Sequence, residues 1–130
     1  MKRFTSKTQK IGEIGEQICL EHLKKQQFEI IETNYTKKSG EIDIIAKKKN
    51  KLHFIEVKSG ILHKDVSYET YNPAENLSKT KLSKIQKTVL IYLQEKDVSY
   101  ETRWQIDLYI VFIDKRLGQH SIECIENIVS

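Results

Sequence analysis

Two adjacent stretches of the chain alternate apolar and polar residues, the pattern expected of β-strands with one buried face. The first stretch is GEIDIIA, residues 40–46. Three apolar residues recur there at every second position and are expected to share one face of a strand: Ile42, Ile44 and Ala46. The same period predicts a second face that carries Glu41, Asp43 and Ile45.

The second stretch, residues 52–58, carries Glu56 and Lys58 on one face with Leu52 and Phe54, and His53, Ile55 and Val57 on the other. A lysine-rich turn over residues 47–51 joins the two stretches, so they are predicted to pair as an antiparallel hairpin. Antiparallel strands align end to start, which brings Glu56 next to Asp43 on the neighbouring strand.

Apolar residues at three- and four-residue steps predict a helix over residues 9–26 and a second helix that ends near residue 94. Asn76 or Ser78 is expected to cap the second helix. Further strands are predicted over residues 28–35, 102–113 and 121–128. The segment 102–113 is apolar and β-branched enough to lie centrally in a sheet, and the last strand is expected at an edge.

Two connections are expected to be irregular. Residues 59–73 have no sustained period and contain the only proline, and this length is typical of functional or mobile loops. Tyr68 and Tyr71 in this segment could stack on nucleic-acid bases or simply pack on the domain. Residues 114–119 are predicted to form a turn around Gly118.

Length and composition fit one globular domain over residues 1–130, with 38% hydrophobic and 31% charged residues. No apolar run is long enough to span a membrane, and the first residues lack a secretory signal, so we expect a cytoplasmic protein without a membrane partner. Cys19 and Cys124 have no metal-binding spacing and are expected to be reduced, buried thiols. The four histidines also lack ligand spacing.

The net charge of +4 admits a polyanionic partner without requiring one. The lysines are clustered, however. One cluster lies in the hairpin turn, with Lys47, Lys48, Lys49 and Lys51, and a second along the second helix, with Lys79, Lys81, Lys84 and Lys87. Such clusters are either solvated surface or phosphate contacts, and two of them around an acidic pair favour phosphate binding.

Asp43 and Glu56 supply two carboxylates that repel each other unless a cation lies between them, and oxygen ligands of this kind suit Mg²⁺ or Mn²⁺. Lys58 adds a positive charge where a reacting oxyanion could be held. Metal-assisted attack on a phosphate is the chemistry that this combination indicates. Glu16 lies near the apolar stripe of the first helix, and its neighbour Gly15 would let another element approach closely.

Asp43, twelve further residues and then Glu56-Val57-Lys58 resemble the PD-(D/E)xK signature of restriction-endonuclease-like nucleases, with Ile42 in place of the usual proline. The chain is also similar to the YraN family of bacterial proteins over most of its length. The matching motifs are Gly15-Glu16, Asn34-Tyr35, GEIDIIA, FIEVK, Lys81 and Ile106-Asp107. Related sequences have glycine where this chain has Gln27, so the first helix is expected to end in another way. A basic residue that usually follows EVK is replaced by Ser59-Gly60, which removes one expected phosphate contact.

This resemblance implies an α/β protein with the restriction-endonuclease-like αβββαβ core, in which helices flank a mixed central sheet. It also implies a Mg²⁺- or Mn²⁺-dependent endonuclease that cleaves DNA phosphodiester bonds, branched or damaged DNA included. Asp43, Glu56, the Val57 carbonyl and Glu16 would bind the metal, and Lys58 would complete the catalytic set. Lys47, Lys48, Lys49, Lys81 and Lys84 would contact nucleic acid.

Several alternatives stay open. Glu16 and Lys81 could be ordinary surface residues, and Asp107 is expected to anchor a helix or a lysine rather than bind metal. The protein could also bind or scaffold nucleic acid without cutting it, or hold a metal only for structure. DNA is favoured over RNA as the partner, and the sequence leaves the oligomeric state open, a homodimer included.

Overall fold

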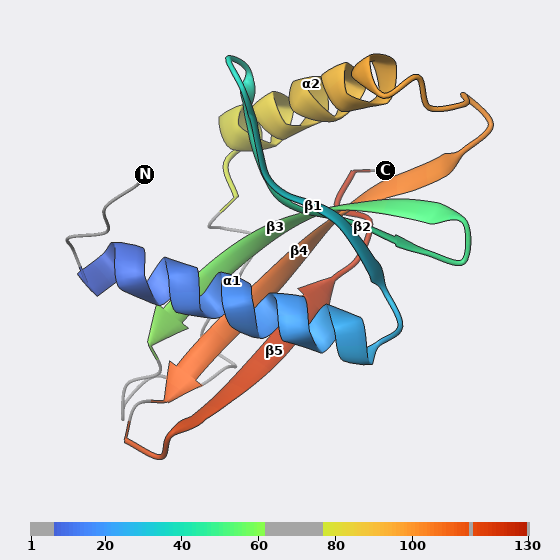
Figure 1. Cartoon of the computed structure of the whole chain (residues 1–130). Helices are drawn as coiled ribbons and strands as arrows, with labels where there is room; N and C mark the ends of the chain where they lie inside the picture. Colours follow the sequence, from blue (N-terminus) through green and yellow to red (C-terminus); the bar gives the residue numbers. More distant parts are fainter. Residues whose placement is uncertain (1–6, 62–76, 115, 130) are drawn as a thin grey trace.

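The computed structural model describes residues 7–61, 77–114 and 116–129, which form one five-stranded mixed sheet with a helix on each face (Figure 1). The elements follow in the order α1 (Lys7–Lys25), β1 (Glu29–Lys37), β2 (Gly40–Lys48), β3 (Lys51–Ile61), α2 (Lys79–Glu95), β4 (Arg103–Asp114) and β5 (Gln119–Ile125). The strands lie in sequence order, and only β3 and β4 run parallel. The predicted αβββαβ core is therefore confirmed, with β4 inside the sheet and β5 at its edge.

The two helices cover opposite faces of the sheet. Neighbouring residues of β3 point to opposite faces, so they pack against different helices. Phe54 lies in a buried cluster with Ile85 and Val89 of α2, whereas Ile55 lies in a second cluster with Cys19 and Leu23 of α1. All six of these side chains are almost completely buried. Glu56 and Lys58 follow Phe54 at alternate positions, so β3 directs both of them toward the α2 side.

The predicted alternation of β2 is wrong at one position. Ile44 and Ala46 lie in the cluster under α1, but Ile42 lies in the cluster under α2. The ladder with β1 pairs Thr33 with Ile44 and Tyr35 with Ile42 and passes over Asn34, whose φ is 52°. Asn34, opposite Asp43 in this register, has a left-handed backbone, and the regular two-residue period of β2 is interrupted at this point.

The hairpin turn between β2 and β3 is shorter than the predicted turn. Lys48 pairs with Lys51, and the two residues between them, Lys49 and Asn50, both have positive φ, 49° and 61°. This conformation is typical of two-residue hairpin turns whose twist matches that of the strands. The turn fixes the register that pairs Ile44 with Ile55 and so sets Asp43 beside the end of β3.

Other expectations have mixed outcomes. Ser78 caps α2 as predicted, with its hydroxyl accepting a hydrogen bond from the Lys81 N–H at 3.0 Å, whereas Asn76 lies outside the described residues. Tyr68 and Tyr71 also lie outside them. The prediction of an irregular segment after Lys58 is wrong at its start, because β3 continues to Ile61 alongside β4. No helix in the described part of the chain has the length and apolar character that a membrane span requires.

Both cysteines are free, but only Cys19 is buried. The expectation of a buried Cys124 is wrong because this residue lies on β5, which has a neighbouring strand on one side only and is largely exposed.

The end of α1 also differs from expectation, because Gln27 adopts the left-handed conformation, φ 70°, that glycine usually supplies at this point. The Phe28 N–H then donates to the Leu23 carbonyl at 3.0 Å and closes the helix in the ordinary way. A side chain in this conformation carries a steric cost that glycine avoids.

We therefore expect Gln27→Gly to stabilise the fold by about 0.5–1 kcal/mol, a rise of a few degrees in the melting temperature. Gln26→Gly is the matched control, since Gln26 does not have a positive φ and should only lose stability. Thermal melts of the three proteins measure both effects. An unchanged or lower melting temperature for Gln27→Gly would contradict the assigned helix end.

Candidate active site

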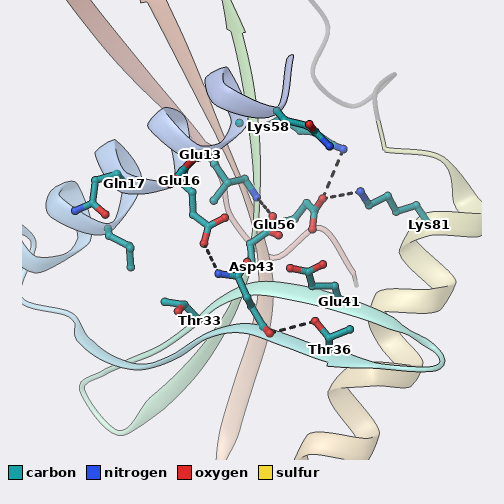
Figure 2. A pocket seen from close by; sticks show the side chains of 15 residues that line it. Glu13, Glu16, Gln17, Thr33, Thr36, Glu41, Asp43, Glu56, Lys58 and Lys81 are labelled. Atoms are coloured by element: carbon teal, nitrogen blue, oxygen red, sulfur yellow. Dashed lines mark hydrogen bonds and ion pairs between the residues drawn. The ribbon is translucent and has the colours of Figure 1, made fainter. Parts of the chain in front are cut away.

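A cavity of about 730 Å³ lies between α1, the first three strands and the start of α2, and the predicted site residues Glu16, Asp43, Glu56, Lys58 and Lys81 all line it (Figure 2). These residues come from four different elements. The hairpin places the two central acids next to each other, as predicted, and each helix adds one further charged side chain.

Glu56 is the most buried acid of the cavity, with only 5% of its side chain exposed. Its Oε1 lies 2.9 Å from the Lys81 ammonium and 3.6 Å from the Lys58 ammonium (Figure 2). Glu56 and Lys58 therefore point the same way, as the strand period predicts. Burial, and then the neighbouring Lys81, lower the pKa of Lys58.

Asp43 is held against β3 by its carboxylate rather than by the strand ladder. Its Oδ2 accepts a hydrogen bond from the Val57 N–H at 2.8 Å. Burial, followed by the charge of Glu56, raises the pKa of Asp43 from 3.8 to about 8, although the Val57 hydrogen bond opposes the rise. The Glu56 carboxylate is thus close enough to disfavour ionisation of Asp43.

Glu16 reaches the cavity because α1 lies very close to β3. A Cβ at Gly15 would lie 1.7 Å from the Ser59 Oγ and 2.7 Å from the Ser59 Cβ, so only glycine fits. Glu16 Oε1 accepts a hydrogen bond from the Asn34 side chain at 3.0 Å, and its charge contributes to the raised pKa of Asp43. The close approach expected at Gly15 is confirmed, and it directs Glu16 into the cavity.

The donor set suits a hard divalent cation. Asp43 and Glu56 present carboxylate oxygens from adjacent strands, and a cation near both would relieve the repulsion that, after burial, raises the Asp43 pKa. Across residues 7–61, 77–114 and 116–129, no group of three or more His, Cys, Asp and Glu side chains is arranged to hold a metal ion. A complete metal shell would therefore need the Val57 carbonyl, a movement of Glu16 or water.

The lysines predicted to contact nucleic acid fall into two places. Lys81 lies at Glu56, and Lys84, one turn further along α2, lines a smaller neighbouring cavity with Gly40. Lys47, Lys48 and Lys49 lie at the turn end of the hairpin, away from Glu56 in the β2–β3 register, and the Lys48 ammonium lies 4.9 Å from the Phe28 ring centre. The structure thus brings only Lys81 to the acids.

Asp107 has partners that the sequence analysis did not identify. It is 1% exposed, and its Oδ2 lies 2.7 Å from His53 Nδ1, while its Oδ1 accepts hydrogen bonds from the Gln105 side chain at 2.6 Å and the Asn127 N–H at 2.9 Å. The expected helix or lysine partner is wrong. The Asn127 hydrogen bond ties the segment after β5 to β4.

Sequence reasoning could have found His53 from one signal. It is a polar residue on the same predicted face of the second hairpin strand as Ile55, and Ile55 pairs directly with Asp107. However, β3 and β4 are separated in the sequence by α2, so their pairing is seen only in the folded chain.

The chain is similar to known proteins over most of its length, including the predicted site residues that line the cavity. A family model described as "Uncharacterised protein family UPF0102" matches residues 15–111, the segment that holds the whole hairpin, α2 and most of β4. A UPF0102 protein of Aliarcobacter butzleri is 42% identical over 118 residues, which cover 90% of this chain and 94% of the relative. A UPF0102 protein of Campylobacter lari is 44% identical over 114 residues, 88% of each chain. One from Helicobacter pylori is 42% identical over 97 residues, 75% of this chain and 78% of the relative.

Proposed function

The chain belongs to the uncharacterised protein family UPF0102, the YraN family that the motifs GEIDIIA and FIEVK indicate, and we propose that it is a metal-dependent endonuclease. Its substrate would be DNA, branched or damaged forms included, and its cofactor Mg²⁺ or Mn²⁺. One observation carries the proposal: two carboxylates on adjacent strands, Asp43 and Glu56, share a cavity with the Lys58 ammonium. A purely structural sheet gains nothing from a buried acid, Glu56, beside a half-buried one, Asp43, that repels it.

Asp43, Glu56 and the Val57 carbonyl would hold the metal, with Glu16 within reach from α1. When bound, the ion supplies a lowered pKa for a coordinated water and polarises the phosphate. Lys58, on the same side of β3 as Glu56, would orient the attacking water or stabilise the negative charge of the pentavalent phosphate. Because the Glu56 side chain is buried, its carboxylate would stay in place when the DNA substrate binds and the product leaves.

DNA phosphates outside the cavity would be bound by lysines and not by base-reading groups. Lys84 lies beside the cavity on α2, and a duplex that extends along the hairpin would reach Lys47, Lys48 and Lys49 at the turn. Contacts of this kind carry no sequence information, so we expect cleavage to depend on DNA structure more than on sequence.

A second candidate function is DNA binding without cleavage. It is favoured by one observation, that two ammonium groups already neutralise Glu56 in the described structure. A site that has become a salt-bridge cluster would keep the fold and the positive surface but need no metal.

The decisive experiment incubates the protein and its Glu56→Gln variant with Mn²⁺ and plasmid, single-stranded, flap and four-way-junction DNA. Wild type should nick or cut at least one of these, and Glu56→Gln should reduce the rate at least about a hundredfold, because removal of a metal ligand costs several kcal/mol of transition-state stabilisation. Glu13→Gln is the matched control, since Glu13 lies at the exposed side of the same cavity and has no part in the proposed mechanism. Binding to the DNA panel without cutting would favour the second function, and neither binding nor cutting would refute both.

A further inference from the structure

Two ammonium groups surround Glu56, although one would be enough to neutralise its single negative charge. Lys81 and Lys58 both approach the same oxygen, Oε1, at 2.9 Å and 3.6 Å (Figure 2). The nearer ammonium does not come from the hairpin, although Lys58 is only two residues away along β3. It comes from α2, on the other side of the cavity.

Lys81 combines a fixed backbone with a partly exposed side chain. Its N–H is the one that the Ser78 cap accepts, and α2 is anchored on the sheet through the buried Ile85 and Val89. The side chain, in contrast, is 45% exposed, and its four methylene groups allow the ammonium to swing without any change in the helix. Lys58 is more enclosed, at 28% exposed, and lies on a strand paired on its β4 side with Ile110.

A divalent cation at Glu56 would place two positive charges within a few ångströms of both ammonium groups. In a partly buried cavity, like charges at that distance repel strongly, so one ammonium must move away. The more exposed and less constrained group is Lys81. After it moves, it remains anchored at the edge of the same cavity.

We propose that Lys81 is an exchangeable counter-ion: it neutralises Glu56 when no metal is bound, leaves when Mg²⁺ or Mn²⁺ binds, and then binds a phosphate oxygen of the DNA. The inference rests on the proposed function, since it concerns the same metal and substrate. It makes Lys81 a competitor of the metal in the free protein and a partner of the metal in the DNA complex. Metal and DNA would therefore bind cooperatively through this side chain.

The first test measures Mn²⁺ affinity without DNA by titration calorimetry at near-physiological salt. Lys81→Gln removes the competing ammonium, so this variant should bind Mn²⁺ about three to ten times more tightly than wild type, the range expected for loss of a partly exposed ion pair. Lys84→Gln is the matched control for the change in net charge, because Lys84 lies one turn further on the same helix and lines the adjacent cavity. It should change the affinity less than about twofold, since salt screens exposed charges at that distance.

The second test measures binding of a short fluorescein-labelled DNA duplex, once in EDTA and once in Ca²⁺ as an oxygen-seeking ion. In EDTA, Lys81→Gln and wild type should bind the duplex equally within about twofold, because Lys81 is engaged by Glu56. In Ca²⁺, Lys81→Gln should bind several times more weakly than wild type, because the released ammonium is missing.

The outcomes separate this inference from the proposed function. If wild type binds Mn²⁺ and cuts DNA but Lys81→Gln leaves the Mn²⁺ affinity unchanged or weaker, the exchange is refuted and the nuclease proposal survives. Equal weakening of DNA binding in EDTA and in Ca²⁺ also refutes exchange, since Lys81 would then contact DNA at all times. If no variant binds Mn²⁺, the metal site itself, and with it the proposed function, fails.

Discussion

Gly15→Ala should lower the melting temperature by roughly 10 °C, although alanine is the better helix former. The added Cβ would lie 1.7 Å from the Ser59 Oγ and 2.7 Å from the Ser59 Cβ. A rotation of the hydroxyl would relieve only the first contact, so α1 or β3 must shift as a whole. Overpacking of this kind costs about 1–3 kcal/mol and occasionally more.

Gly12→Ala is the control on the same helix, because a Cβ there meets nothing within 4 Å. It should instead raise stability by about 0.5–1 kcal/mol, as expected for glycine replaced by alanine in a helix. The opposite signs of two identical substitutions, measured by thermal melts, would isolate the contact between α1 and β3. A Gly15→Ala protein as stable as Gly12→Ala would contradict the described packing.

A double variant makes the argument specific to Ser59. Gly15→Ala with Ser59→Gly removes both clashing atoms, and the remaining neighbour, the Val111 Cβ at 3.7 Å, is an ordinary contact. The Ser59 hydroxyl is also buried without a hydrogen-bond partner among the described residues, so its loss carries little cost. The double variant should therefore be more stable than Gly15→Ala alone, a coupling that independent sites would not give.

The consequence for the site is direct, since Gly15 sets the position of Glu16. If α1 moves away from β3 to accommodate a methyl group, the Glu16 carboxylate moves with it, away from Asn34 and the cavity. We expect the folded fraction of Gly15→Ala to lose part of any Glu16-dependent activity, which the double variant should restore.

The sequence predicted the hairpin and its acids well because their signals are local. Alternation in two adjacent stretches and a short polar turn are sufficient to place Glu56 beside Asp43, and a glycine in an otherwise regular helix marked the approach at Gly15. The prediction failed at Ile42, where the period is interrupted opposite the left-handed Asn34 of the neighbouring strand. An interruption that one strand imposes on another is not visible in the period of either.

Contacts that cross the long α2 connection were the least predictable. The Asp107 pair with His53 needs the parallel register of β3 and β4, and the Lys81 ion pair with Glu56 needs the direction in which α2 returns over the sheet. Residue types indicated that each side chain required a partner or a function. They did not indicate which one, because a buried charge can be satisfied by many equivalent neighbours.

Metal-free wild type should lose stability as the pH rises from about 4 to about 8, and Asp43→Asn should not. The pKa of Asp43 is raised from 3.8 to about 8 in the folded protein by burial and by Glu56, so the folded state keeps a proton that the unfolded state has released. Stability falls wherever the folded state binds more protons, by up to about 1.4 kcal/mol per pH unit for one group. Below pH 4 both states are protonated at Asp43, and above pH 8 both are ionised, so the slope from this group is confined to that window.

Asparagine keeps the shape of Asp43 and an oxygen that can accept the Val57 hydrogen bond, but it has no charge to lose. In EDTA at pH 8 the variant should therefore melt several degrees above wild type, and the difference should shrink toward pH 4. Mn²⁺ should reverse the order at pH 8, because a ligand that binds only the folded state adds about 2.7 kcal/mol at a hundredfold excess over its Kd, and Asp43→Asn should lose most of this gain. Thermal melts of both proteins across this pH range, in EDTA and in a Mn²⁺ series, measure the pH dependence of stability and the shift caused by Mn²⁺. A variant that melts below wild type throughout, or that keeps the full Mn²⁺ shift, would make Asp43 a structural residue and leave Glu56 without its partner in the proposed site.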